Sequence, residues 1–187
     1  MLIVLSSPSG GGKTTVAHKI LRKDRNIVRS VSCTTRARRP GEREGIDYFF
    51  VAPEKFKDML KRRQFLESAW VHGFHYGTPR PWVESHLRAG KDVLLVIDVQ
   101  GGRAVRRKSK DALLLFLVPP SFETLKKRLV GRHSDSPEAV KVRLKDAPGE
   151  IAAGKHYDYR IVNDKLGEAV AEVARTVRLE RRLRSKD

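Results

Sequence analysis

A glycine-rich loop between an apolar run and a helical pattern constrains this chain more than any other feature. The stretch SSPSGGGKTT fills positions 6–15 and directly follows the apolar run at residues 2–5. A turn of this kind points backbone N–H groups at an anion, at the positive end of the helix dipole. Lys13 can then reach the β- and γ-phosphates of a nucleotide, and the Thr14 hydroxyl can ligate Mg²⁺. The loop therefore predicts a nucleoside triphosphate site.

One position departs from the usual phosphate-loop pattern G-x-x-x-x-G-K-[ST], because Ser7 stands where the first glycine is expected. This position lies where the strand ends, away from the residues most crowded by phosphate, so a small residue can serve there. We therefore expect the whole loop to bind a nucleoside triphosphate, through Ser7, Pro8, Ser9, Gly10, Gly11, Gly12, Lys13, Thr14 and Thr15, and the family resemblance given below implies that it is ATP.

Continuous apolar runs alternate with helical patterns along the chain. A final short strand is expected at residues 159–162, and the continuous runs are residues 2–5, 93–97 and 113–118. They lack the alternation of a half-exposed strand, which favours a parallel sheet covered on both faces. Helical patterns occupy residues 14–21 and the segment after Ser121, a residue suited to capping a helix. The order predicts a doubly wound α/β fold.

The alternation of apolar runs and helical patterns is interrupted between about residues 33 and 80. The segment TTRARRPGEREGIDYFFV is charged and loop-like, a helical pattern covers residues 53–63, and FLESAWVHGFHYGT suggests further β-structure. We expect a small subdomain inserted into the parallel core. Its clustered arginines form a credible second phosphate site, because arginine pairs bidentately with phosphate oxygens. A solvated basic loop is the alternative interpretation of the same residues.

Composition limits the domain size, the binding partners and the cellular compartment to be expected. The chain has 187 residues, enough for one sizeable α/β domain, and its 39 Lys and Arg against 22 Asp and Glu give a net charge of +17. Such a charge attracts anions, but the basic residues are not interleaved with stacking aromatics, which weakens a nucleic-acid interpretation without removing it. A single cysteine, Cys33, and the lack of a long apolar run lead us to expect a cytoplasmic protein with no membrane partner. The oligomeric state is left open.

Five motifs in order resemble the guanylate kinase family. SVSCTTRARRPGEREGIDYFFV is similar to the GMP-binding loop of that family, FLESAWVHGFHYGTP to its base-recognition segment, and IDVQG to its core-strand motif. VPPSFETLKKRLVGR resembles the approach to its lid, and YDYRIVND resembles its final core strand. The resemblance implies one domain over residues 1–187, with a P-loop NTPase core at 1–32, 81–131 and 155–187. It also implies a GMP-binding insert at about 33–80 and a helical lid at about 132–154.

The same resemblance implies an activity and the residues that carry it. ATP phosphorylates GMP, and we expect dGMP as well, with Mg²⁺ as the cofactor. The implied ligands of the GMP phosphate are Ser32, Arg36, Arg39, Tyr48 and Tyr76, and the residues that read guanine are Glu67, Thr78 and Asp98. The implied catalytic residues are Lys13, Arg36, Arg132 and Arg143; Thr14 and Asp98 are the implied metal ligands, and Asn163 is placed near adenine.

The assignment of Glu67 makes chemical sense. Guanine presents N1–H and its 2-amino group side by side as donors, and one carboxylate can accept both. Adenine has an acceptor at N1 and no 2-amino group, so the carboxylate would be left unpaired at a cost of about 1–3 kcal/mol or more. Glu67 is therefore expected to discriminate between bases as well as to bind one.

The chain departs from the family pattern at three places. Val96 stands where an acidic residue is usual, which puts metal affinity and turnover in question, and His133 replaces the glycine that usually follows Arg132. Pro148 and Gly149 predict a kink or an early end in a helical stretch. His72 and His75 have a spacing suited to a metal, but without a third ligand a structural role is the favoured interpretation.

Three alternative functions are considered. A non-catalytic interaction module could keep the fold, but such a module need not retain Lys13, Thr14, Arg132 and Arg143. A related kinase could phosphorylate another small acceptor, although Glu67, Tyr76 and Thr78 favour guanine. Nucleic-acid binding through the basic surface could coexist with catalysis.

Overall fold

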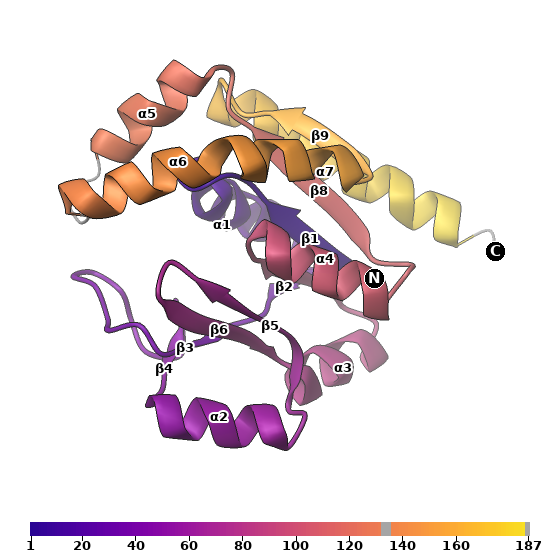
Figure 1. The fold of residues 1–187 in the computed structure, drawn as a ribbon. Helices are drawn as coiled ribbons and strands as arrows, with labels where there is room; N and C mark the ends of the chain where they lie inside the picture. Colours follow the sequence, from indigo (N-terminus) through magenta and orange to yellow (C-terminus); the bar gives the residue numbers. More distant parts are fainter. Residues whose placement is uncertain (132–135, 186–187) are drawn as a thin grey trace.

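The computed structural model describes residues 1–131 and 136–185, and its centre is a parallel sheet (Figure 1). The strands of this sheet are β1 (Leu2–Ser6), β2 (Ile27–Arg29), β7 (Asp92–Val96), β8 (Leu113–Val118) and β9 (Tyr159–Val162). They lie in the order β2-β7-β1-β8-β9, and every neighbouring pair is parallel. The predicted doubly wound sheet is confirmed. The edge strand β2 is an addition that the sequence pattern did not reveal, because it is only three residues long.

Helices cover both faces of the core sheet. They are α1 (Lys13–Lys23) and α7 (Leu166–Arg184) on one face, and α3 (Arg80–Arg88) and α4 (Val99–Lys108) on the other. Successive side chains of a strand point to opposite faces. Ile3 and Leu5 therefore pack with α1 and α7, whereas Leu2 and Val4 pack with α3 and α4. Continuous apolar strands are needed because neither face meets water.

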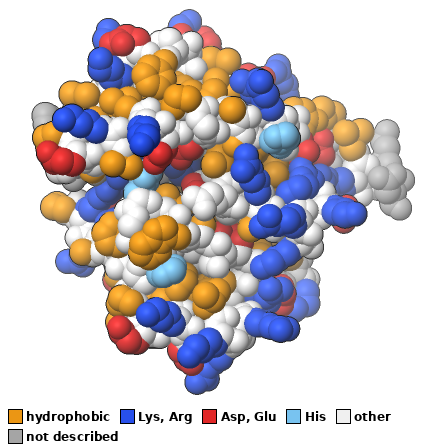
Figure 2. All heavy atoms as spheres, in the orientation of Figure 1, with side chains coloured by type: hydrophobic (Ala, Val, Ile, Leu, Met, Phe, Trp, Pro, Cys, Tyr) orange, Lys and Arg blue, Asp and Glu red, His pale blue; other side chains and the backbone are white. Residues whose placement is uncertain are grey.

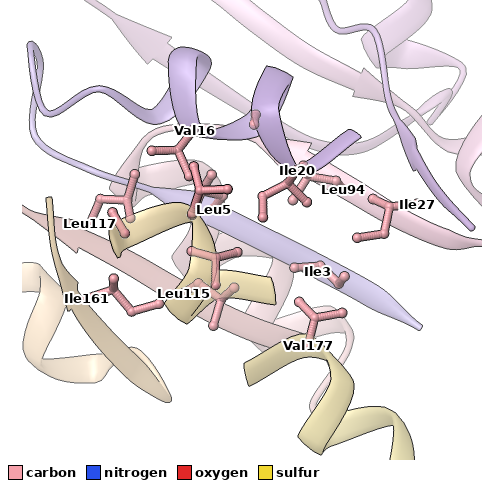
Figure 3. Packing of buried hydrophobic residues seen from close by; sticks show 14 of the residues in the cluster. Ile3, Leu5, Val16, Ile20, Ile27, Leu94, Leu115, Leu117, Ile161 and Val177 are labelled. Carbon is pink, nitrogen blue, oxygen red and sulfur yellow. The ribbon is translucent and has the colours of Figure 1, made fainter. Parts of the chain in front are cut away.

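The cluster beneath α1 and α7 also fixes the last helix of the chain. Figure 3 shows Val177 of α7 close to Ile3 of β1, and Val16 and Ile20 of α1 pack in the same cluster. Val173 and Val177 are buried, as an apolar helix face requires. Leu179 is 47% exposed, because two residues further on the helix has turned to its outer side.

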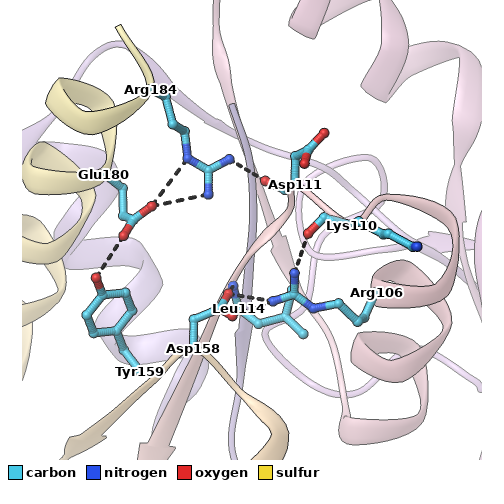
Figure 4. Close-up of polar contacts among 8 residues, drawn as sticks. All are labelled: Arg106, Lys110, Asp111, Leu114, Asp158, Tyr159, Glu180 and Arg184. Carbon is cyan, nitrogen blue, oxygen red and sulfur yellow. Dashed lines mark hydrogen bonds and ion pairs between the residues drawn. The ribbon is translucent and has the colours of Figure 1, made fainter. Parts of the chain in front are cut away.

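Part of the excess basic charge serves to fasten this helix. The Tyr159 hydroxyl donates to Glu180 at 2.7 Å, and Glu180 accepts from Arg184 at 3.2 Å and 3.3 Å. Arg184 also donates to the carbonyl oxygen of Asp111, so the end of α7 is joined to the start of β8 (Figure 4).

A second network holds the loop before β9. Arg106 of α4 donates to both carboxylate oxygens of Asp158, at 2.6 Å and 2.5 Å, and Asp158 also accepts from the backbone N–H of Leu114 at 2.8 Å. Figure 2 shows that basic side chains are spread over the visible face and outnumber acidic ones. The surface therefore attracts anions over a wide area. Among the described residues, no helix has both the length and the apolar character needed to cross a bilayer.

A second sheet occupies the residues expected for the insert. Its strands are β3 (Cys33–Thr34), β4 (Phe49–Phe50), β5 (Phe65–Val71) and β6 (Phe74–Pro79), in the order β4-β3-β6-β5, and α2 (Pro53–Lys61) packs on it. Phe56 of α2 is fully buried and stacks on Phe65 with ring centroids 4.5 Å apart. Cys33 completes this small core, so the insert has packing of its own.

Two helices form the remaining layer, α5 (Phe122–Val130) and α6 (Pro137–Ala153), followed by the 3₁₀ turn η1 (Gly154–His156). The predicted cap is confirmed, because the Ser121 hydroxyl accepts from the N–H of Thr124 at 3.0 Å. The predicted early end at Pro148 is wrong, since α6 continues to Ala153. Ala147 is buried against Leu125 and Leu129 of α5, and this packing holds the helix together although Pro148 lacks an N–H. Arg132 and His133 lie outside the described residues.

Candidate active site

One cleft of about 410 Å³ joins the loop after β1 to the inserted sheet. The loop and α1 contribute Ser9, Gly10, Gly12, Lys13, Thr14 and Thr15 to its walls. The inserted sheet and the loops beside it contribute Ser32, Arg36, Arg39, Tyr48, Glu67 and Tyr76. Asp98 follows β7, and Arg143 comes from α6. Residues expected to bind two different substrates thus line a single space.

The phosphate loop has the backbone that its glycines suggest. Gly10 and Gly12 have φ angles of +83° and +90°, a left-handed conformation that other residues rarely adopt. A Cβ atom on Gly12 would lie 2.4 Å from Nδ2 of Asn163. Both backbone strain and a collision therefore restrict position 12 to glycine.

Asn163 supports this loop from behind. Its Nδ2 donates to the carbonyl oxygen of Gly11 at 2.8 Å, and the residue is 5% exposed. Ser7 is also buried, with its hydroxyl 2.9 Å from the carbonyl oxygen of Pro8, and a Cβ on Gly11 would lie 2.7 Å from the Ser7 Cβ. Ser7, Pro8, Gly11 and Asn163 are not among the described residues that line the cleft, so their expected contacts with ATP remain predictions.

Helix α6 is docked onto the phosphate loop through Ser9. The Arg143 guanidinium donates to the Ser9 hydroxyl at 3.3 Å, and the Ser9 N–H donates to Oε2 of Glu150 at 3.0 Å. Burial raises the pKa of the Glu150 carboxyl, and nearby Asp98 and Asp146 act in the same direction. Arg143 therefore reaches the loop from the segment that was expected to be the lid.

Hydrogen bonds fix the guanidinium of Arg36 at the side of the cleft formed by the inserted sheet. Its guanidinium donates to Glu42 at 2.7 Å and to the Tyr76 hydroxyl at 3.3 Å, and lies 5.5 Å from the ring centroid of Tyr48. Burial lowers the pKa of Arg36, but the bonds to Glu42 and Tyr76 outweigh it and raise the pKa overall. Glu42 also accepts from the N–H of Arg39 at 2.8 Å. The loop thus presents arginine in a fixed orientation, as bidentate phosphate binding requires.

Glu67 lines the buried end of the same cleft, and Thr78 lies behind it, outside the cleft wall. The Thr78 hydroxyl donates to Oε1 of Glu67 at 2.5 Å, and the two residues are 0% and 3% exposed. Burial raises the pKa of Glu67 to about 7; the bond from Thr78 opposes this shift and the charge of Asp98 adds to it. The hydroxyl oxygens of Ser32 and Thr78 are 3.4 Å apart. A carboxylate with one oxygen bonded to Thr78 suits a pair of adjacent donors on a base.

Asp98 is positioned by the start of α4. Its Oδ1 accepts from the N–H of Gly101 at 3.0 Å, capping the helix. A Cβ on Gly101 would lie 2.8 Å from Oε2 of Glu67, so glycine leaves the room that this carboxylate occupies. The close approach accounts for the first of the two glycines after the IDVQ segment, a signal that sequence reasoning did not use.

A buried hydroxyl pair supports the same region from below. The Tyr157 hydroxyl donates to Ser6 at 2.8 Å, and Ser6 donates to the carbonyl oxygen of Asp98 at 3.3 Å. Burial raises the pKa of Tyr157 to about 12, which keeps it protonated and able to donate. A Cβ on Gly102 would lie 2.0 Å from the Tyr157 hydroxyl oxygen. The end of β1 and the Asp98 turn are thereby tied together.

The residues present fit a magnesium ion bound with a nucleotide. Thr14 and Asp98 both line the cleft and offer oxygen atoms, the ligands that Mg²⁺ prefers. In the described part of the chain no three His, Cys, Asp or Glu side chains gather to form a metal cage. Mg²⁺ in kinases needs no such cage, because phosphate oxygens and water complete its shell. Val96 lines the same cleft, so an apolar side chain stands where an acidic one was expected.

Sequence reasoning missed several residues of the cleft, namely Arg29, Glu42, Asp47, His72 and Glu150. His75 has the structural role expected of it, stacking on Phe56 with ring centroids 5.1 Å apart. His72 does not share that role, because it turns into the cleft from the end of the β5–β6 hairpin.

Comparison with known proteins gives a consistent result. The family model described as guanylate kinase matches residues 1–180. The guanylate kinase of Symbiobacterium thermophilum is 46% identical over 181 residues, covering 97% of this chain and 86% of the relative. That of Thermotoga maritima is 44% identical over 180 residues, with coverage of 96% and 87%. The crystal structure of guanylate kinase from Anaplasma phagocytophilum superimposes with a TM-score of 0.82 at 38% identity, covering 96% of this chain and 85% of that one.

Proposed function

The chain belongs to the guanylate kinase family, and we propose that its cleft is where the γ-phosphate of ATP passes to GMP. The family activity converts ATP and GMP into ADP and GDP. The observation that carries the assignment of the site is the placement of Glu67, held by the bond from Thr78, at the buried end of a cleft that also contains Lys13. One end of the space suits a triphosphate, and the other suits a guanine base.

The acceptor end accounts for both parts of GMP. Arg36, Arg39, Tyr48, Tyr76 and Ser32 are proposed to bind its phosphate, and Glu67, Thr78 and Asp98 are proposed to read its base. Arg36 supports this division, because Glu42 and Tyr76 hold its guanidinium in place. These side chains are assigned to the phosphate and the base and none to the 2′-hydroxyl, so dGMP is proposed as a second acceptor.

Phosphoryl transfer in this site needs no general base. The attacking atom is a phosphate oxygen of GMP, which is ionised near neutral pH because its second pKa is about 6. The residues then have to align the two phosphates and neutralise charge as the bond changes. We propose Lys13 and Arg143 for the donor side and Arg36 for the acceptor side. Arg132, outside the described residues, is proposed as a second arginine from the lid segment.

Magnesium is proposed as the cofactor, held by the Thr14 hydroxyl and the Asp98 carboxylate. When bound, it supplies positive charge beside the β- and γ-phosphates. Lys13 has the same electrostatic task from the protein side, and the backbone N–H groups of the loop add to it. Asp98 enters this site already oriented by its bond from Gly101.

The reaction is proposed to occur in the cytoplasm, within a single domain made of the core, the insert at about 33–80 and the lid at about 132–154. The pKa of Cys33 is raised to about 11 by burial, so its thiol is unreactive and consistent with a reducing compartment. Nucleic-acid binding through the basic surface remains a separate hypothesis.

A coupled assay tests the proposed function. ATP and Mg²⁺ are offered with GMP, dGMP, AMP, CMP or UMP, and ADP formation is followed. We expect turnover with GMP and dGMP and rates lower by about 5- to 150-fold or more with the other three, since leaving a buried carboxylate mispaired costs about 1–3 kcal/mol, and more for a charge. Binding of GMP without turnover would instead support a non-catalytic interaction module.

A further inference from the structure

His72 occupies an unusual backbone position at the tip of the β5–β6 hairpin. The strands pair up to Val71 and Phe74, so His72 and Gly73 form the two-residue turn. Both have positive φ angles, +48° and +85°, as this tight turn requires. Glycine, asparagine and aspartate dominate such a first position, and histidine is not among them, although it tolerates a positive φ better than most residues. An uncommon backbone state beside an active site is a reason to look for a role of the side chain.

The His72 side chain crosses the cleft to α6. Its Nδ1 lies 3.5 Å from Oδ2 of Asp146, and the two side chains are 24% and 47% exposed. Figure 1 shows the hairpin lying below α6, and the pair connects them. Burial lowers the pKa of His72, and the charges of Arg143 on α6 and of Lys13 act in the same direction, whereas Asp146 and Asp98 oppose them. The contact with Asp146 therefore joins a carboxylate to an imidazole that favours its neutral form.

His72 and Asp146 each belong to an element that carries residues proposed to bind a substrate. The hairpin carries Glu67 on β5 and Thr78 on β6, which are proposed to read guanine. Helix α6 carries Arg143 one turn before Asp146, and Arg143 already contacts the phosphate loop at Ser9. The pair therefore joins the element that recognises the acceptor to the element that supplies a phosphate-binding arginine.

We propose that His72 is a positioning residue for phosphoryl transfer, acting through Asp146 to align α6, and with it Arg143, over the cleft. The proposal rests on the proposed function of this site. A partly exposed contact is weak, so it can form and break in each catalytic cycle. Its expected contribution to the turnover number is about two- to fivefold, with little effect on ATP binding.

A double-mutant cycle tests the proposal. His72→Gly keeps the turn, because glycine favours its backbone angles, but removes the imidazole. Asp146→Ala removes the partner on the exposed side of α6, and Glu138→Ala, which removes another exposed carboxylate of the same helix, is the matched control. We expect each of the first two variants to lower kcat with GMP about two- to fivefold, and the double variant to lower it no further. Unchanged kcat in both, or multiplying losses, would overturn the proposal.

A second measurement does not depend on catalysis. Hydrogen exchange of the nucleotide-free protein reports on α6 directly. Faster exchange over residues 137–153 is expected in His72→Gly and Asp146→Ala, with α7 unchanged and Glu138→Ala like the wild type beyond its own first turn. Equal exchange of α6 in all variants would contradict the link. If the wild type failed to phosphorylate GMP, the proposed function would fail, while this measurement would still decide whether the pair holds the helix.

Discussion

The hydroxyl of Thr78 donates a hydrogen bond of 2.5 Å to Glu67, and this bond orients a carboxylate that has almost no contact with solvent. A buried carboxylate resists ionisation unless something compensates its charge. Thr78 supplies one donor, and a guanine base would supply two more. The free site is therefore electrostatically incomplete, and its most natural complement is the substrate.

Replacing Glu67 by glutamine should separate the two substrates. The amide presents a donor to a base that also presents donors, so kcat/KM for GMP is expected to fall by at least about 100-fold, whereas ATP affinity changes less than about twofold. Steady-state kinetics and ATP binding measure the two effects. Glu54→Gln, an exposed change on α2, is the matched control and should behave like the wild type. Equal losses of GMP turnover and ATP affinity would contradict the assignment.

The affinity for GMP should depend on pH around neutrality. Glu67 has a pKa raised to about 7 in the free protein, so below that pH it carries a proton that guanine binding must displace. The dissociation constant is expected to rise by up to about tenfold for each pH unit below 7. The GMP phosphate also titrates, near pH 6, so Glu67→Gln serves as the reference that retains only the phosphate contribution. Parallel pH profiles for the two proteins would refute the effect.

The same substitution should stabilise the folded protein at alkaline pH. Glu67 has an ordinary value of 4.5 and a folded value of about 7, so the folded state holds the proton more tightly. This contribution is complete below pH 4.5 and is lost as the pH rises through 7. Above that pH the buried charge costs on the order of 3 kcal/mol, which Glu67→Gln removes. Thermal unfolding at pH 8 should show a higher Tm for the variant, and the difference should nearly vanish at pH 4.5.

Two glycine substitutions should shift stability in opposite directions. Gly102→Ala places a Cβ 2.0 Å from the Tyr157 hydroxyl and is expected to lower the free energy of unfolding by about 1–3 kcal/mol. Gly149→Ala meets nothing within 4 Å on α6 and is expected to raise it by about 0.5–1 kcal/mol through helix propensity. Denaturant unfolding compares both with the wild type. A Gly102→Ala variant as stable as the wild type would contradict the packing described around Tyr157, and a Gly149→Ala variant that loses stability would contradict the open space on α6.

Restoring an acid at position 96 should strengthen metal binding. Val96 lines the cleft together with Asp98 and Thr14, so Val96→Glu adds negative charge near the proposed Mg²⁺. The Mg²⁺ concentration for half-maximal activity is expected to fall about two- to fivefold. Val96→Gln has the same shape without the charge and should leave the Mg²⁺ dependence unchanged. Identical dependences in the two variants would show that this position does not face the metal.

The core of the fold was predictable because its signals are local. Residues 2–5 and 113–118 form uninterrupted apolar runs, and a sheet covered on both faces is the structure that can bury them. The continuation of α6 past Pro148 was not predictable, because it depends on Ala147 packing against α5. Tertiary contacts outweighed a local preference that was correctly identified.

The site was predictable to a different extent. Lys13, Arg36 and Glu67 belong to motifs whose residue types already indicate phosphate or base chemistry. His72 and Glu150 carry no such signal, since each gains its position only when the inserted sheet and α6 meet the phosphate loop. Asn163 has a task that its motif did not indicate, because its amide donates to the carbonyl oxygen of Gly11, while its expected contact with ATP remains a prediction.

The bond between Asn163 and Gly11 has a consequence for the order in which the protein matures. Its two residues are 152 positions apart, so a ribosome has made most of the chain before the partner of the loop exists. Until β9 has been added at the sheet edge, the phosphate loop lacks the amide that supports it from behind. Among the features of the nucleotide site, the earliest loop to be synthesised is thus completed by one of the latest segments. The hydrogen bond that supports the phosphate loop from behind is therefore acquired only late in translation.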